Sequence, residues 1–325
     1  MALIEVDALS TLFPSGEGDL RAVDGLSFAV QPGETVAIVG ESGSGKSVTV
    51  MSIMRLLGAA TRHEGAVRFE GRDLLALSEA EMRKVRGNRI GMIFQEPMTA
   101  LNPVQTIGSQ IAESLRLHRG LSRRDSRARA LEMLSLVGIP APERRIDEYP
   151  HQLSGGMRQR VMIAMALACD PALLIADEPT TALDVTVQAQ ILDLIREQAR
   201  KLGAGVILIT HDLGVVAELA DRVIVVYAGR KVEEGTAAEI LDRPRHPYTR
   251  GLLEATPRLR GGGGHRAGRM TEIPGNVPGL AEILAGCAFE PRCAHAQPCC
   301  RIERPPEVPV AQDHLVVCRR AEPVS

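Results

Sequence analysis

Short apolar runs bordered by glycine and proline open the chain. Residues 3–6 and 26–30 form two short, mainly apolar β-type runs, and the apolar residues 36–39 form a third run that leads into a glycine-rich stretch. Apolar runs this short, bounded by Gly and Pro, are typical of strands. The first fifty residues are therefore predicted to form a strand-rich lobe, with a helix after the third run.

The pattern changes in the middle of the chain. Residues 78–168 are charged and helical in pattern, and residues 123–137 repeat apolar positions every three or four residues. We expect a separate helical subdomain over about 96–168, with Cys169 as a small core side chain. The apolar runs 172–176 and 205–210 flank a helical stretch, 185–202, which predicts a parallel βαβ unit.

Composition and charge limit the classes of protein. The chain has 325 residues, of which 45% are apolar and 24% charged, and its net charge of −2 provides no basic field for nucleic acid. No apolar run reaches the roughly 18 residues that span a bilayer, and an acid stands near the start where a signal peptide is basic. We expect a cytoplasmic protein whose link to a membrane is a partner.

A change of composition after residue 259 divides the chain into a large domain, 1–259, and an extension, 260–325. Four glycines at 261–264 and the basic residues His265, Arg266 and Arg269 begin the extension. A solvated linker is the expected reading, and contact of the basic residues with phosphates or a partner is the alternative.

The glycine-rich stretch has the sequence Gly40-Glu-Ser-Gly-Ser-Gly-Lys46-Ser47, which fits the phosphate-loop pattern G-x-x-x-x-G-K-[ST]. Its glycines allow successive N–H groups to surround a phosphate at a helix N-terminus. Lys46 can reach the β- and γ-phosphates of a nucleoside triphosphate, and Ser47 can bind Mg²⁺. The residues expected to contact the nucleotide are Gly40, Ser42, Gly43, Gly45, Lys46 and Ser47.

Two acids end the apolar run at 173–176. Asp177 suits the Mg²⁺ shell, and Glu178 can polarise the attacking water as general base. Alone, such a pair is most often an ordinary strand end; with the phosphate loop it indicates a catalytic site.

Further motifs resemble the ATP-binding-cassette (ABC) ATPases over residues 1 to about 255. Leu153-Ser-Gly-Gly-Met-Arg-Gln159 matches their signature loop, Gln95 their Q-loop, His211 their switch histidine and Asp184 their inter-subunit loop. The resemblance implies an α/β P-loop NTPase (RecA-like) core with an antiparallel β lobe, a helical subdomain and here a small Cys-rich extension.

The resemblance also implies roles for these residues. Ser154, Gly155 and Gly156 of one subunit would cover ATP held by the phosphate loop of another, in a head-to-tail dimer. Gln95 would orient water and sense Mg²⁺, and His211 would bond the γ-phosphate. Phe13 would stack on adenine, with a plain core role as the alternative.

Four segments resemble the dipeptide and oligopeptide importer subfamily: residues 95–104, 246–253, 273–280 and 286–293. The resemblance implies a second homologous ATPase, two membrane permeases, an extracytoplasmic solute-binding protein and a peripheral place at the cytoplasmic face of the membrane. Nickel, another small solute or an antimicrobial peptide are alternative cargoes. A soluble ABC ATPase acting on ribosomes or DNA, or an iron–sulfur regulatory module, is a rival of another class.

Five of six cysteines lie in the extension, and in a reducing cytosol such a group favours a metal over disulfides. The related importers carry a four-cysteine iron–sulfur cluster, whose pattern matches Cys287, Cys293, Cys300 and Cys318, with Cys300 preferred to Cys299. Four thiolates also suit Zn²⁺, although close C-x-x-C pairs are lacking. A [4Fe–4S] cluster is the prediction, and zinc or no metal are the alternatives.

Overall fold

The structure is a computed structural model of residues 1–325, and it describes all of them except 17, 181–183, 256–272, 283–284 and 322–325. The chain forms two compact units. The first contains Met1–Ile4, Val30–Thr35 and Phe69–Ile209, and the second contains Glu5–Ala29, Val36–Arg68 and Thr210–Ser325.

Three parallel strands form the sheet of the first unit. β7 (Leu173–Asp177) pairs on one side with β6 (Ile90–Ile93) and on the other with β8 (Gly205–Ile209). Every residue of these strands is buried, as expected of parallel strands covered on both faces. The helix α8 (Val185–Leu202) connects β7 to β8, so the predicted βαβ unit is confirmed.

The expectation that residues 78–168 are helical is wrong at β6. This strand has only four residues, Ile90–Ile93, and helical segments lie on both sides of it. An apolar run of this length has no period that separates strand from helix. Pairing with β7 decides its conformation, and that contact is nonlocal.

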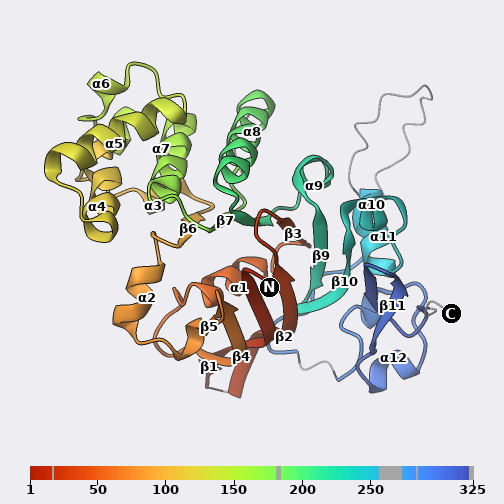
Figure 1. Ribbon diagram of the computed structural model, residues 1–325. Coiled ribbons are helices and arrows are strands. Elements are labelled where there is room, and N and C mark those ends of the chain that lie inside the picture. Colours follow the sequence, from red (N-terminus) through yellow and green to blue (C-terminus); the bar gives the residue numbers. More distant parts are fainter. Residues whose placement is uncertain (17, 181–183, 256–272, 283–284, 322–325) are drawn as a thin grey trace, which may run out of the picture. The chain divides into compact units, whose positions relative to one another are not determined.

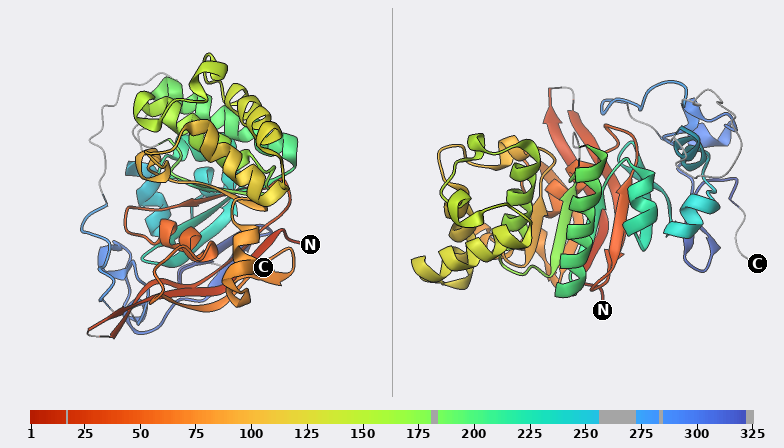
Figure 2. Two further views of the ribbon diagram at one scale, coloured as in Figure 1. Left: turned by 90° about the vertical axis from the view of Figure 1, so that its left-hand side faces the viewer. Right: turned by 90° about the horizontal axis from the view of Figure 1, so that it is seen from above.

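Helices dominate the rest of the first unit. Figure 1 shows α4 (Ile107–Arg119), α5 (Arg123–Leu136) and α7 (Gly155–Leu167) side by side, and they stay together in both views of Figure 2. Ser122 caps α5 by accepting a hydrogen bond from the Asp125 N–H at 3.1 Å. The helix predicted from residue 123 is confirmed. The remaining elements are β5 (Arg72–Asp73), η1 (Leu74–Ala76), α2 (Glu79–Val85), α3 (Pro97–Ala100), α6 (Pro142–Arg145) and η2 (Pro150–Gln152).

The second unit contributes strands to two sheets. In one, β1 (Ile4–Ser15) lies between β2 (Gly18–Val30) and β4 (Arg62–Phe69). In the other, the strand order is β11-β12-β10-β9-β3, with β3 parallel to β9 and the other pairs antiparallel. These strands are β3 (Thr35–Val39), β9 (Arg222–Tyr227), β10 (Arg230–Thr236), β11 (Glu307–Ala311) and β12 (His314–Val317). The helices are α1 (Lys46–Ile53), α9 (Leu213–Leu219), α10 (Ala237–Asp242), α11 (Pro247–Ala255), η3 (Glu290–Arg292) and α12 (Cys299–Ile302).

The C-terminal residues extend this second sheet. β12 pairs with β10, and His314 Nε2 lies 2.7 Å from Oε1 of the fully buried Glu233. The Glu233 carboxylate also accepts hydrogen bonds from the N–H groups of Arg245 and His246, at 2.7 and 3.0 Å. The predicted domain boundary at 259–260 and the basic linker lie outside the described residues.

Candidate nucleotide site

The phosphate loop connects β3 to α1, the order that the sequence predicts. Gly45 precedes the first turn of α1 with φ of 96°, a left-handed conformation that favours glycine. A Cβ atom at this position would lie 2.7 Å from the carbonyl oxygen of Ala22. Both the torsion angle and the close backbone approach therefore require glycine here.

Lys46 is held inside the loop. Its side chain is 5% exposed, and Nζ donates hydrogen bonds to the carbonyl oxygens of Gly40 and Glu41 at 2.8 and 2.9 Å. Ser44 Oγ is buried and has no hydrogen-bond partner among the described residues. A buried ammonium and an unsatisfied hydroxyl in one glycine-rich loop fit a phosphate, and Ser47 follows in the first turn of α1.

Gln95 and Glu178, far apart in the sequence, meet in the first unit. Gln95 Nε2 donates a hydrogen bond to Glu178 Oε2 at 3.1 Å. The preceding residue, Asp177, ends β7 and is 2% exposed, whereas Glu178 is half-buried and has a left-handed φ of 45°. Its N–H donates to the Ile209 carbonyl at 3.0 Å, which anchors the residue after β7 to the end of β8.

The predicted signature loop lies at the N-terminus of α7. Ser154 caps this helix by accepting a hydrogen bond from the Met157 N–H at 3.4 Å, and Ser154 and Gly155 are exposed. A Cβ at Gly155 would meet open space, while one at Gly156 would contact Val187 at 3.4 Å. The loop therefore presents a hydroxyl and a helix N-terminus to the surface, an arrangement that suits an anion.

One link between these segments was not predicted from the sequence. Gln159, on the first turns of α7, is buried and donates a hydrogen bond from Nε2 to the Pro179 carbonyl, just beyond Glu178. It therefore ties the signature helix to the end of β7. Its place in the signature segment is the only local signal, because the contact depends on how α7 packs.

Three further predicted residues lie at element boundaries or edges. Asp184 caps α8, accepting a hydrogen bond from the Val187 N–H at 3.0 Å, while residues 182 and 183 of the same motif lie outside the described residues. His211 is exposed and stands just before Asp212, the cap of α9. Phe13 is half-buried near the end of β1.

The predicted residues divide between the two units. Gln95, Asp177, Glu178, the signature loop and Asp184 belong to the first, and Phe13, the phosphate loop and His211 belong to the second.

Three other cysteines of the C-terminal segment act on the Cys287 thiol. The pKa of the Cys287 thiol is raised to about 11, chiefly by burial and in smaller part by Cys318, Cys300 and Cys293. Cys299 is exposed, and it is not among the main causes of the shift in the Cys287 pKa. However, no group of three or more His, Cys, Asp or Glu side chains within the described ranges is placed to hold a metal ion. This arrangement does not support the predicted iron–sulfur cluster.

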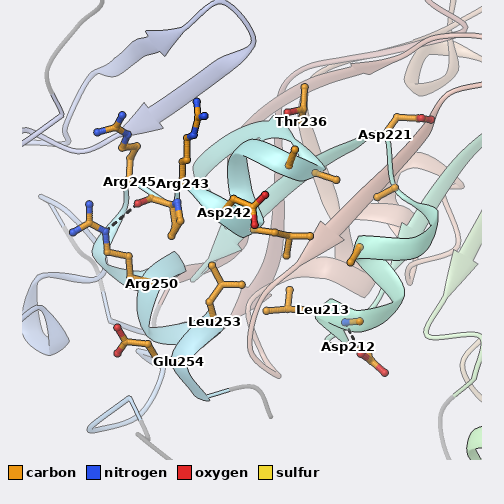
Figure 3. Close-up of a pocket in the computed structure, with 17 residues that line it drawn as sticks. Asp212, Leu213, Asp221, Thr236, Asp242, Arg243, Arg245, Arg250, Leu253 and Glu254 are labelled. Atoms are coloured by element: carbon orange, nitrogen blue, oxygen red, sulfur yellow. Dashed lines mark hydrogen bonds between the residues drawn. The ribbon is translucent and has the colours of Figure 1, made fainter. Parts of the chain in front are cut away.

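A hollow of about 1250 Å³ lies elsewhere in the second unit, between α9, α10 and α11 (Figure 3). Acidic side chains such as Asp212 and Asp221 and basic ones such as Arg243 and Arg250 line it. It contains none of the residues predicted to bind nucleotide, so its size does not make it the nucleotide site.

Comparison with known proteins identifies the family. A family model described as "ABC transporter" matches residues 23–181, and one described as "Oligopeptide/dipeptide transporter, C-terminal region" matches residues 232–300. A putative peptide import ATP-binding protein of Brucella abortus is 52% identical over 99% of this chain and 98% of its own length. The chain belongs to the ABC transporter ATPases. The oligopeptide transport ATP-binding protein OppD of Bacillus subtilis is also 52% identical, over 97% of this chain and 87% of its own.

Solved structures agree with the ABC ATPase fold. The ATP-binding cassette MJ0796, solved as a dimer in a post-hydrolysis state with ADP and Pi, is 32% identical and matches with a TM-score of 0.65. The match covers 72% of this chain and 98% of that one. The cbiO1 protein of Clostridium perfringens, part of the transporter complex cbiONQ, matches at 28% identity and a TM-score of 0.62 over 74% of this chain and 91% of its own. This ABC ATPase has, over its described residues, no helix both long and apolar enough to cross a bilayer.

Proposed function

We propose that this ABC ATPase energises the uptake of dipeptides or oligopeptides through membrane permeases. The observation that carries the cargo class is the similarity of its C-terminal region, residues 232–300, to the corresponding region of oligopeptide and dipeptide transporters. Two peptide-import relatives match it over nearly the whole chain, not only over the motor. The chain would act at the cytoplasmic face of the membrane.

The phosphate loop is the proposed binding site for the ATP phosphates. Lys46, with its ammonium group at the loop carbonyls, would neutralise the β- and γ-phosphates, and the N–H groups before α1 would bind their oxygens. Ser47 and the buried Asp177 would hold Mg²⁺, with Gln95 as a further oxygen ligand; Mg²⁺ would supply charge neutralisation at the phosphates. Phe13 is the proposed adenine contact.

Glu178 is the proposed general base. Gln95 holds one oxygen of its carboxylate, which orients the other for a proton of the attacking water. His211 would donate a hydrogen bond to the γ-phosphate and so report the nucleotide state.

A second ATPase subunit would complete the site. Ser154, Gly155 and Gly156 present anion-binding groups without a base or a metal ligand of their own, so they suit the phosphate of a neighbouring subunit. Asp184 would contact that neighbour. The helical subdomain after Gln95 would dock the permeases and transmit closure of the dimer.

Two variants test the chemistry. Lys46→Ala should remove ATP binding, and Glu178→Gln should remove turnover while leaving ATP binding and dimer closure intact, because the amide cannot accept the proton of water. Phosphate release and nucleotide binding are measured on the complex reconstituted with its permeases. Normal turnover by Glu178→Gln would refute its role as base.

Crosslinking tests the shared site. The variants Ser154→Cys in one subunit and Ser42→Cys in the other are combined with Glu178→Gln in both. We expect crosslinks between the subunits that form only when ATP is present. The protein with its six native cysteines alone is the control. An equal yield of crosslinks with and without ATP would contradict the head-to-tail site.

Cargo is tested by copurification with the native permeases and a comparison of solutes that stimulate hydrolysis. We expect peptides to stimulate ATP hydrolysis. If only nickel or another small solute stimulates it, that solute replaces peptides as the proposed cargo.

We also propose that Cys287, Cys293, Cys300 and Cys318 bind an iron–sulfur cluster once their side chains turn toward a common centre. The effect of Cys318, Cys300 and Cys293 on the Cys287 pKa supports their proximity to Cys287. Anaerobic purification with iron, sulfide and zinc analysis distinguishes a cluster from zinc, and a folded protein free of all three would refute the proposal.

A further inference from the structure

Glu41, the residue after the first glycine of the phosphate loop, is held by two residues more than 200 positions later. Arg292 places its terminal nitrogens 2.8 and 3.3 Å from the two oxygens of the Glu41 carboxylate. The hydroxyl of Tyr248 accepts a hydrogen bond from the Glu41 N–H at 2.8 Å. We name Glu41, Tyr248 and Arg292 the Glu41 clamp; all three belong to the second unit.

The clamp and Lys46 share one peptide group. The Gly40 carbonyl accepts a hydrogen bond from Lys46 Nζ at 2.8 Å, and the N–H of the same peptide is the one bonded to Tyr248. A trans peptide is planar, and its C=O and N–H point in opposite directions. Fixing the N–H therefore fixes the carbonyl on which Lys46 rests.

Arg292 is itself held in place. Its side chain is 6% exposed, and it donates hydrogen bonds to the carbonyls of Ile273 and Pro274 at 3.0 and 2.9 Å. Its guanidinium also lies 5.7 Å from the centre of the Tyr227 ring. A largely buried, bidentate pair of this kind is much better ordered than an ion pair in water.

A cluster of aromatic rings contacts both Tyr248 and Arg292 of the Glu41 clamp. The centroid of Tyr227 lies 4.7 Å from Tyr248 and 5.2 Å from Phe289, and Tyr248 and Phe289 are 5.4 Å apart. Trp is absent from the chain, and Tyr and Phe number only three and five. Three of these eight rings thus join β9, α11 and the segment before Arg292.

The C-terminal segment also runs along the outside of the loop. Residues 275–280 line a hollow together with Glu41, Ser42 and Gly43. The two segments therefore border one hollow beside the phosphate loop.

We propose that Tyr248 and Arg292 are positioning residues for ATP binding. They hold the peptide between Gly40 and Glu41 in the orientation that places Lys46 for the phosphates, which gives the C-terminal segment a direct effect on nucleotide affinity. This inference rests on the proposed role of Lys46.

The test compares Tyr248→Phe, Glu41→Gln and Arg292→Gln in the full-length chain. The Kd for ATP is measured by displacement of a fluorescent nucleotide, and KM and kcat are measured in the complex with permeases. We expect Kd and KM to rise by about fivefold in Tyr248→Phe, the scale of one lost hydrogen bond, with kcat changed less than KM. The Kd and KM of Arg292→Lys should lie between those of Arg292→Gln and the wild type.

Arg301→Gln is the matched control, because the exposed Arg301 pairs with Glu290 of the same segment and has no hydrogen bond or ion pair with Glu41. Adding Glu41→Gln to Arg292→Gln should change the Kd little beyond Arg292→Gln alone, since the contact between Glu41 and Arg292 is already lost. If the substitutions acted through a general loss of packing, their effects would add in the double variant and the Tm would fall.

Wild-type Kd and KM in Glu41→Gln and Tyr248→Phe would overturn the proposal, as would an equal shift in Arg301→Gln. If Tyr248→Phe does not fold, Glu41→Gln against Arg301→Gln decides the question. Lys46→Ala separates the two claims: normal ATP binding by that variant would refute the proposed nucleotide site itself.

Discussion

Glu178 reaches Gln95 through an unusual backbone angle. Its φ of 45° is left-handed, a conformation that costs a non-glycine residue about 1 kcal/mol or more. The N–H bond to Ile209 and the contact with Gln95 hold it there. These two contacts fix both the backbone and the carboxylate of the proposed base.

Replacing Gln95 should separate turnover from binding. In Gln95→Ala the Glu178 carboxylate loses its hydrogen-bond donor, and a misplaced base lowers kcat by roughly a hundredfold. The Kd for ATP should change far less than in Lys46→Ala. Phosphate release and nucleotide binding measure the two quantities, and an equal loss of both would contradict a role in orienting Glu178.

His246 makes stability depend on pH. Burial lowers its pKa from 6.5 to about 4, so the unfolded chain binds its proton at a higher pH than the folded chain does. The contribution is complete above pH 6.5 and is lost as the pH falls toward 4, a total of about 3 kcal/mol. Burial alone would raise the pKa of Glu233, but hydrogen bonds from His314 and from the N–H groups of Arg245 and His246 lower it. The contribution of this carboxylate to stability is therefore also lost as the pH falls, below pH 4.5.

Urea unfolding between pH 7 and 4.5 tests this. His246→Asn should unfold with a flatter pH dependence than the wild type, because the titrating ring is gone. Identical slopes in the two proteins would show that His246 does not titrate on unfolding in this range.

Two helix caps of the same kind allow an effect on stability to be distinguished from an effect on function. Ser154 and Ser122 cap α7 and α5 through the same kind of hydrogen bond, from the N–H three residues later. Removing either hydroxyl should cost about 1 kcal/mol of stability. Only Ser154 lies in the signature loop.

Ser154→Ala should therefore lose ATP turnover in the assembled complex, while Ser122→Ala keeps it. Binding of ATP by the single chain should be normal in both, because the phosphate loop is intact. Thermal unfolding provides the stability comparison, and unchanged turnover in Ser154→Ala would argue against the role of its hydroxyl in a shared site.

For the molecule as a whole, the C-terminal strand pair is part of a core sheet. Val316 of β12 is fully buried beside β10, whereas Val308 of β11 is only partly buried. A buried carboxylate without a partner is far more costly than one that reaches water. The extension is thus stabilised by strand pairing, besides any metal that its cysteines bind.

Val316→Asp should destabilise the full chain by about 3 kcal/mol or more, and Val308→Asp by much less. Equilibrium unfolding measures both. Equal, small effects would show that β12 contributes little to the stability of the second unit.

Much of this protein follows from local sequence. The strand-loop-helix order at Gly40–Ser47, the βαβ unit around α8 and the helix starting at residue 123 depend on spacing and on residue types that fit only one conformation. The motif residues are recognisable for the same reason: glycine, lysine and serine at fixed intervals satisfy a phosphate through backbone geometry. The family follows from such motifs.

Contacts between distant segments required the tertiary structure. The strand β6 is too short to show a period, and the bonds of Gln95 to Glu178, Gln159 to Pro179, and Tyr248 to Glu41 join residues whose separation in sequence carries no signal. The sequence determined which groups the chain possesses and their local conformations. Only folding, which closes long loops to bury apolar surface, decided which of those groups meet.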